Sequence, residues 1–170
     1  MLSEEAEGLT QPADADKPHP PYGAYAGIMS TFAGGLATAG ALAKLLGREP
    51  RENTALDLAV LSFATFKTAR TISRDEVTSF IRAPFVEGEA HEGGEEPVPT
   101  GDLQQAIGEL VTCSRCIGTW AAAGLASAQI LAPRFGRLLT WSLAAAGVND
   151  WLQAGFAGLT AKANEVQRRT

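Results

Sequence analysis

Both cysteines of the chain lie in one C-x-x-C pair, Cys113 and Cys116. Two thiolates at this spacing can bind one face of a metal ion, or can cycle between dithiol and disulfide. Structural zinc usually takes four ligands, so the pair supplies half a site unless His19, His91 or a second subunit contributes. Three interpretations stay open: a redox pair, a zinc site shared by two chains, and two small residues kept reduced by the cytosol.

The pair stands at the junction of two predicted helices. A short surface helix is expected over Asp102–Thr112, with Asp102 as its N-cap and Gln105 reaching back as in a capping box. A run of 18 residues without charge, Cys116–Pro133, follows and is long enough to cross a bilayer. A cysteine at a helix N-terminus has its thiolate stabilised by free N–H groups, and the neighbouring Arg115 adds positive charge.

Three further stretches predict membrane helices. Ala24–Ala43 contains 20 residues without a charge, although a buried helix of a soluble protein is the rival interpretation. Thr54–Ile72 is expected as a second span, and Leu138–Ala161 as a fourth, after a short basic turn at Arg134–Arg137. The sequence therefore predicts an all-α integral membrane bundle of about four spans, with the short surface helix before the C-x-x-C span.

Charged side chains inside these segments are candidate site residues. Asp150 interrupts the fourth span, and a carboxylate in hydrocarbon must pair, neutralise or face water. Lys67 and Arg70 are its expected partners; the pairing either is structural or belongs to a proton or ion pathway. With Arg74 they share one helical face, spaced i, i+3 and i+7. This basic face is an interfacial anchor, an anion or lipid-headgroup site, or the partner of Asp150, and we expect it near the cysteines.

The polar stretches divide the chain into three parts. Residues 1–23 are predicted to be a disordered tail, because the segment is rich in proline and charge. The membrane helical domain covers 24–161 and contains a flexible acidic loop at 86–101. Residues 162–170 form a polar tail. Between the second span and the loop, Pro84 is expected to end any helix, and Arg82 could pair with Asp75.

Charge distribution limits the function and predicts an orientation. The net charge is -5, and no basic patch with interleaved aromatics is present, so nucleic-acid binding is not expected. The acidic N-terminus has no early apolar run, which argues against a cleaved signal peptide. The side that holds both termini and the central loop has nine Lys and Arg residues, against five on the other side. The positive-inside rule therefore predicts that both termini and the C-x-x-C pair are cytoplasmic.

Several motifs together resemble one family of bacterial membrane proteins, called domain of unknown function 1360. The resemblance covers roughly Thr65 to Leu159 and rests on four motifs: Lys67-x-x-Arg70, Asp75-Glu-Val-Thr-Ser-x-x-Arg82-Ala-Pro-Phe85, Glu109-Leu-Val-Thr-Cys113-x-x-Cys116-x-Gly-x-Trp120 and Asn149-Asp150. The Ser-Arg between the cysteines departs from the aromatic or proline often found there. The resemblance implies an integral membrane protein, with members linked to sporulation in some bacteria, and it implies no established activity.

The sequence thus predicts a non-enzymatic multi-pass protein of the bacterial inner membrane, with a structural or interaction role. Its expected partners are the lipid bilayer and either a second copy or another membrane protein. The enzymatic alternative is a thiol oxidoreductase that passes electrons between Cys113/Cys116 and a quinone. The third possibility is a dimer sharing one zinc ion, the only cofactor that the residues suggest.

Overall fold

The computed structural model describes residues 20–50, 52–88 and 94–169, and the chain is all-helical apart from one short strand pair. The all-α prediction is confirmed. The tail residues 1–19 and His91 lie outside the described residues. The elements, in chain order, are α1 (Tyr22–Leu45), α2 (Ala55–Arg74), η1 (Glu76–Thr78), α3 (Ser79–Arg82), η2 (Ala83–Phe85), β1 (Val86–Glu87), β2 (Glu96–Pro97), α4 (Leu103–Thr112), α5 (Ser114–Leu131) and α6 (Pro133–Arg169).

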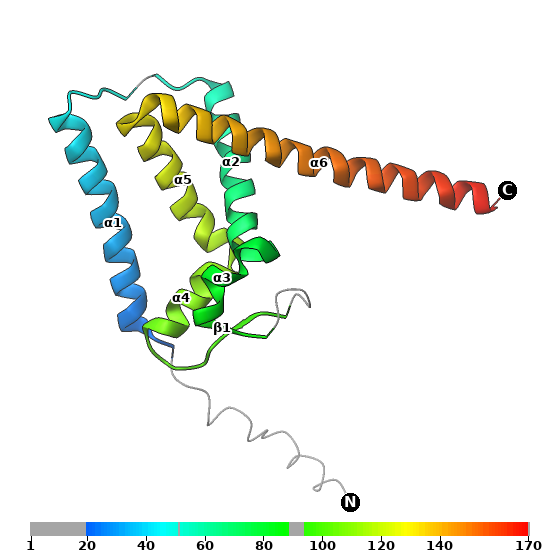
Figure 1. Cartoon of the computed structure of the whole chain (residues 1–170), viewed down its shortest axis with the longest axis horizontal. Coiled ribbons are helices and arrows are strands. Elements are labelled where there is room, and N and C mark those ends of the chain that lie inside the picture. The colour runs from blue at the N-terminus through cyan, green and yellow to red at the C-terminus, as the bar shows by residue number, and fades with distance from the viewer. Residues whose placement is uncertain (1–19, 51, 89–93, 170) are drawn as a thin grey trace, which may run out of the picture.

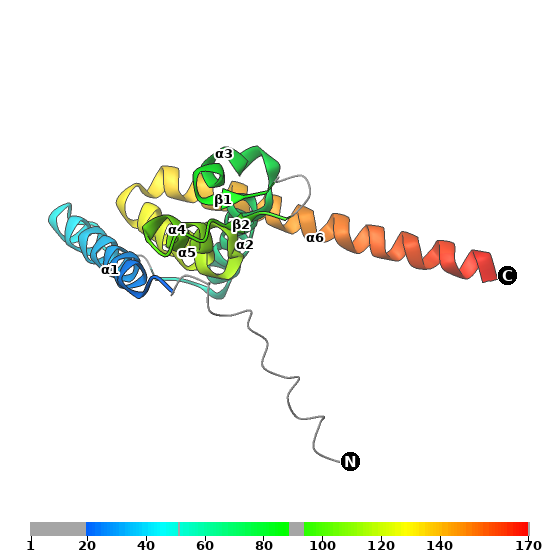
Figure 2. The ribbon, with the colours of Figure 1, turned by 90° about the horizontal axis from the view of Figure 1, so that it is seen from below.

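Helices α1, α5 and α2 stand in a row, and α6 packs on α5 and α2. In Figure 1, α1, α2 and α5 stand roughly upright, whereas α6 runs across α2 and then projects away from the body. Seen from below in Figure 2, α1 stands apart from the other helices, and α4 lies across the end of the group. The buried core is small and lies where α2, α5 and α6 meet, at Ala64, Leu125 and Ala144.

Two glycines of α6 permit this close crossing. A Cβ atom at Gly136 would lie 2.5 Å from the backbone of Ala128 on α5, and one at Gly147 would lie 2.7 Å from the carbonyl oxygen of Phe63 on α2. Such distances are shorter than any side chain allows, so only glycine fits. The backbones of α5 and α2 therefore touch α6 directly, and the position of α6 is fixed at both contacts.

The helix starts follow the capping residues in the sequence. Thr54 and Asp57 form a full capping box at the start of α2. Asp102 caps α4 as predicted, accepting a hydrogen bond of 2.9 Å from the Gln104 N–H. Gln105 reaches back one residue further than predicted, to the N–H of Gly101. Hydrogen bonds from the Thr100 hydroxyl and then from the Gln104 N–H hold the pKa of Asp102 below its usual value.

The predicted helix boundaries after Pro133 are wrong. The segment Arg134–Arg137, expected as a turn, is the first turn of α6, and the helix continues through the predicted polar tail to Arg169. Pro133 is the first helical residue, a position where its missing N–H has no cost. At the other end, Glu165 bonds Lys162 and Arg169 at helical spacings, which supports the last turns.

A fully buried arginine organises the segment after α2. The Arg82 side chain is 0% exposed and donates to the carbonyl oxygens of Ile72 at 2.7 Å and Asp75 at 3.1 Å, which belong to the end of α2. Its Nε also forms an ion pair of 2.7 Å with Glu95. The predicted pairing of Arg82 with the Asp75 carboxylate is therefore wrong, because the guanidinium meets the backbone of that residue. Pro84 lies inside η2 rather than at a helix end.

Two short paired strands form within the acidic loop predicted at 86–101, close to the Arg82–Glu95 pair. Val86 pairs with Pro97 and Glu87 with Glu96 in an antiparallel register, which forms β1 and β2. The loop thus returns to the segment from which it leaves, and Glu95 is placed beside Arg82.

Hydropathy supports one membrane span where the sequence predicted four. Among the described residues, α1 is the helix long and apolar enough to cross a bilayer, with a mean hydropathy of 1.3. Its 24 residues extend about 36 Å, more than the roughly 30 Å of a hydrocarbon core. The other three long helices are long enough but less apolar.

Replacing Arg82 tests whether this buried guanidinium holds the segment in place. Arg82→Met leaves Glu95 without its cation and two carbonyl groups of α2 without a donor, so we expect a loss of about 3–5 kcal/mol in the free energy of unfolding. Arg74→Met removes an exposed arginine of the same helix and is the matched control, with an expected change below about 0.5 kcal/mol. Thermal unfolding followed by circular dichroism measures both, and equal effects would contradict the assignment.

Candidate functional site

The two cysteines are joined in a disulfide at the start of α5. Cys113 is the N-cap residue of this helix, and its sulfur accepts a hydrogen bond of 3.2 Å from the N–H of Cys116. The second sulfur belongs to the first turn, and Arg115 lies exposed between the two cysteines. A thiolate formed here by reduction would face the positive end of the helix dipole, which stabilises a negative charge. The two cysteines therefore lie at the start of a helix, as predicted.

The residues around the disulfide contact α2. Ser114, one of the two residues between the cysteines, forms a 2.5 Å hydrogen bond with the buried Ser73 of α2. One turn into α5, a Cβ built at Gly118 would meet Ala69 at 3.7 Å. Ala69 and Ser73 lie about a third of a turn around α2 from the basic face, since a helix turns once every 3.6 residues. Within the basic face, Lys67 meets Asp150 of α6, and the expected nearness of this face to the cysteines stays a prediction.

The basic face and Asp150 form a second cluster, between α2 and α6. The Nζ atom of Lys67 lies 3.0 Å from the Asp150 carboxylate and 3.7 Å from the Asp75 carboxylate. Asp75 in turn accepts a hydrogen bond of 2.8 Å from the Thr71 hydroxyl. Lys67 was one of the two cations expected to pair with Asp150, and it is the one that meets the carboxylate. One ammonium group thus bridges two acids on different segments.

Close packing explains why these charges meet. Gly147 precedes Asp150 by one helical turn, and a Cβ at Gly147 would lie 3.3 Å from the Cβ of Lys67. The lysine stem therefore runs along α6 from the glycine to the acid. The Lys67 side chain is 22% exposed and the Asp150 side chain 32%, so the pair is half-buried and screened less than a surface pair.

A cavity of about 490 Å³ opens beside this pair. Lys67 and Arg70 contribute two cations to its lining, Asp75 and Asp150 contribute two carboxylates, and Trp151 forms an apolar part of the wall. Arg74, the third member of the predicted basic face, is exposed and does not line the cavity. The four charges balance, so the cavity suits water or a small polar group better than a free anion.

Metal binding has little support in this geometry. Within residues 20–50, 52–88 and 94–169, no three His, Cys, Asp or Glu side chains gather as metal ligands would. His19 and His91, the histidines considered as further ligands, lie outside the described residues. The disulfide also excludes zinc at the same pair, since the ligand is the free thiolate. A shared zinc site would need reduced cysteines on two chains.

Three contacts of this region escaped the sequence analysis. They are the pairing of Glu95 with Arg82, the Ser73–Ser114 hydrogen bond, and the hydrogen bond from the Tyr25 hydroxyl to Glu109. Arg82 and Glu109 both belong to motifs that had been singled out, but their partners lie outside these motifs. No local pattern identifies such partners, because the contacts depend on the return of the loop and on the approach of α1 to α4.

Two of three comparisons with known proteins gave matches. The family model described as "Protein of unknown function (DUF1360)" matches residues 60–156. Sporulation protein YjcA of Bacillus subtilis (strain 168) is 31% identical over 117 residues, which cover 58% of this chain and 95% of that protein. No solved structure matches. The family match includes Lys67, Arg82, the cysteines and Asp150, and thus both clusters described above.

Replacing Lys67 should lower the stability more than replacing Asp150, although the two side chains form one ion pair. Lys67→Met leaves Asp75 and Asp150 without the ammonium group that lies between them, whereas Asp150→Leu leaves Lys67 with Asp75. We therefore expect Lys67→Met to cost more stability, and the double variant to cost less than the sum of the singles by about 1–2 kcal/mol. Thermal unfolding of the four proteins in detergent measures this interaction energy.

The exposed pair of Lys162 and Glu165, also at 3.0 Å, is the matched control. A double-mutant cycle there should give less than about 0.5 kcal/mol, because water screens exposed charges. An interaction energy at Lys67–Asp150 no larger than that of the control would show that the pair does not hold the helices together.

Proposed function

The chain belongs to the family described as "Protein of unknown function (DUF1360)", and from that premise we propose that it is a multi-pass helical membrane protein with a structural or interaction role. The observation that supports this proposal is that the fully buried large side chains are polar, whereas many large apolar side chains are exposed. The largest fully buried side chains are Arg82, Thr140 and Ser73, all of them polar. A soluble domain of this size would bury large apolar side chains instead.

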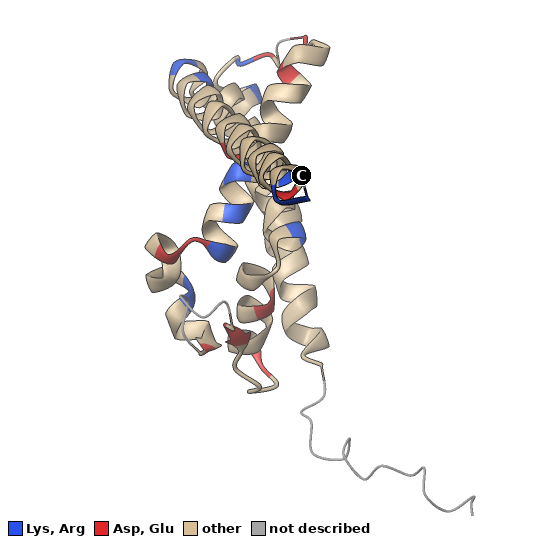
Figure 3. Ribbon diagram, turned by 90° about the vertical axis from the view of Figure 1, so that its right-hand side faces the viewer, with Lys and Arg blue, Asp and Glu red and all other residues tan. Residues whose placement is uncertain are grey.

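The large apolar side chains lie on the outside. More than a dozen are exposed on helices α1, α2 and α6, among them Met29, Leu45, Leu58, Leu138, Trp151 and Phe156. Helices α1 and α5 contain one charged residue each, Lys44 and Arg115, and Figure 3 shows that most of the helical surface in this view carries no charge. Apolar surface of this extent marks a site of contact with lipid or with another protein. A polar interior is compatible with lipid contact, since polar side chains of membrane bundles hydrogen-bond across helices.

The proposed placement is the bacterial inner membrane, with α1, α2, α5 and α6 as the four spans. Both termini, the central loop and the cysteines then lie in the cytoplasm, as the positive-inside count favours. The crossing of α6 over α2 favours a different number of spans, in which α6 lies at the membrane surface and the other three long helices cross the membrane. The two arrangements differ in where they place the C-terminus.

The biological role is proposed from the similar protein. The printed name of that protein refers to sporulation, and we extend this to the present chain as a membrane component of the same kind of process. The exposed stripe of Leu152, Phe156 and Leu159, spaced i, i+4 and i+7 on the projecting part of α6, offers a contact surface for a second copy or another membrane protein.

Membrane extraction and topology reporters test this proposal together. We expect the chain to stay in the pellet after washing with alkaline carbonate and to need detergent for release. Reporter fusions before residue 20, at the α1–α2 turn and after Arg169 should give cytoplasmic, external and cytoplasmic signals for four spans. An external C-terminal signal would support three spans with α6 on the surface. Recovery of the chain in the soluble fraction would refute the membrane proposal.

A thiol oxidoreductase is the second candidate, favoured by the disulfide at the helix N-terminus. Oxidation of the dithiol to this disulfide releases two electrons and two protons, and a quinone can accept both as it becomes a quinol. The active cysteines would be Cys113 and Cys116, with Arg115 and the helix dipole stabilising the thiolate. A dimer that shares zinc between two reduced pairs is the third candidate.

Thiol trapping in cells, combined with metal analysis, separates these candidates. Redox cycling predicts a substantial disulfide fraction that falls when the quinone pool is reduced. A shared zinc site predicts reduced cysteines and about half a zinc per chain, because one ion takes four ligands. Purely structural cysteines predict a redox state that does not follow the quinone pool, and no metal. Cys113→Ser is the control for the disulfide-specific label.

A further inference from the structure

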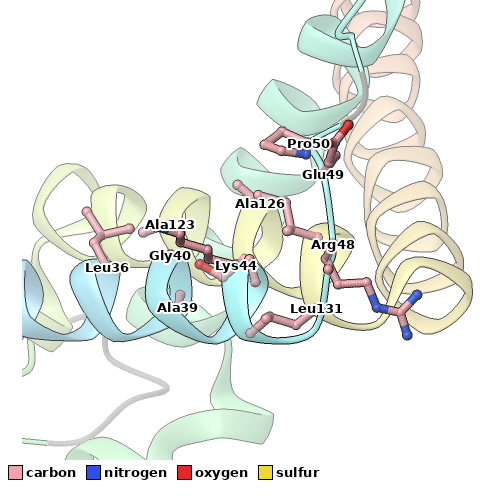
Figure 4. Close-up of a pocket in the computed structure, with 14 residues that line it drawn as sticks. Leu36, Ala39, Gly40, Lys44, Arg48, Glu49, Pro50, Ala123, Ala126 and Leu131 are labelled. Carbon is pink, nitrogen blue, oxygen red and sulfur yellow. The ribbon is translucent and has the colours of Figure 1, made fainter.

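A groove lies between α1 and α5, on the far side of the molecule from the disulfide and the charged cavity. Its volume is about 500 Å³, within the range of small-molecule pockets. Figure 4 shows short side chains from the two helices facing each other across it. Those that form its walls are Leu36, Ala39 and Gly40 on α1, and Ala123, Ala126 and Leu131 on α5.

The groove exists because an aromatic contact holds α1 and α5 apart while mostly small residues line the space beyond it. Phe32 and Trp120 pack edge to face with their ring centroids 5.1 Å apart and set the separation of the two helices. Beyond this contact most lining residues of the two helices are small, with Leu36 and Leu131 among the larger ones, and they leave part of the space between the helices unfilled. A cavity lined by apolar groups gains stability when an apolar chain enters and displaces water.

The open end of the groove is positively charged. Lys44 lies in the last turn of α1, and Arg48 follows in the turn after it. Within the described residues, neither cation has an ion-pair partner. One carboxylate, Glu49, also lines this end, and Figure 4 shows its side chain directed away from that of Arg48. The mouth therefore has one net positive charge and two cations available to an anion.

We propose that this groove binds one acyl chain of an anionic phospholipid, whose phosphate lies against Lys44 and Arg48. This inference rests on the membrane placement proposed above. An apolar channel with cations at its mouth matches an anionic amphiphile in shape and in charge. A helix from a second copy is the other occupant to consider, and the filling variant below tests for it. Basic pockets between membrane helices on the cytoplasmic side bind phosphate headgroups, and this groove would present the same charges on the external side in the placement proposed above.

Lipid retention measured by native mass spectrometry tests the charge at the mouth. The protein is released from mixed phosphatidylglycerol and phosphatidylcholine vesicles into detergent, and the bound lipid is counted. We expect one phosphatidylglycerol per chain to be retained in preference to phosphatidylcholine. The double variant Lys44→Gln/Arg48→Gln should reduce this preference roughly tenfold. Lys162→Gln/Arg168→Gln, which removes two exposed cations far along α6, should leave the preference unchanged.

A filling variant tests the groove itself. Gly40→Leu places an apolar side chain in the groove, and Gly34→Leu places one on the same helix outside it; a Cβ at either position meets nothing within 4 Å. Both variants raise the helix propensity of α1 equally, so they differ only in the space that they occupy. We expect Gly40→Leu to abolish retention and Gly34→Leu to preserve it. Inorganic phosphate added in excess should not displace the lipid, because phosphate alone cannot fill the groove.

The outcomes separate this inference from the membrane proposal. A chain that stays in the carbonate-washed pellet but retains no lipid, or retains both lipids equally, overturns the inference alone. A dimer that Gly40→Leu dissociates, with no lipid bound, assigns the groove to a second copy and also overturns it. A chain recovered in the soluble fraction refutes both proposals.

Discussion

The ion pair between Lys67 and Asp150 is the constraint on which the arrangement of the helices depends. Each charge lies in a long helix that otherwise presents apolar or small residues to its neighbours, and neither can be left unpaired without a large cost in desolvation. The 3.0 Å contact fixes how α2 and α6 are rotated about their axes. Gly147 makes it possible, because any side chain there would separate the two backbones. Lys67 is directed toward α6, and the neighbouring face of α2 meets the start of α5, where Ser73 bonds Ser114 beside the disulfide.

Polar contacts thus determine the interior, whereas apolar side chains determine the exterior. Arg82 ends α2 by donating to two of its carbonyl oxygens and joins it to the returning loop through Glu95. The apolar core consists of little more than Ala64, Leu125 and Ala144. So small a core supplies little hydrophobic stabilisation in water. The lipid environment that we propose would resolve this difficulty, because it would cover the apolar exterior.

The sequence predicted what depends on local chemistry. Asp102 was identified as a cap from its position before an apolar run, Asp150 was expected to need a cation, and the cysteines were expected at a helix start. The sequence failed where distant segments meet. Glu95 looked like one of many acids in a polar loop, and nothing nearby indicated that it pairs with Arg82. Pro133 was taken as the end of a span, although proline is also a common first residue of a helix, as it is in α6.

The central claim is that the apolar exterior faces lipid while the polar contacts lie inside. Spin labels on a Cys113→Ser/Cys116→Ser background test it directly, through their collisions with oxygen, which concentrates in lipid, and with a water-soluble nickel complex. The exposed positions Met29 on α1 and Phe156 on α6 are compared with the exposed Glu96 of β2. The account predicts that Met29→Cys and Phe156→Cys labels collide mainly with oxygen, and the Glu96→Cys label mainly with nickel. Equal access of nickel to all three labels would contradict it.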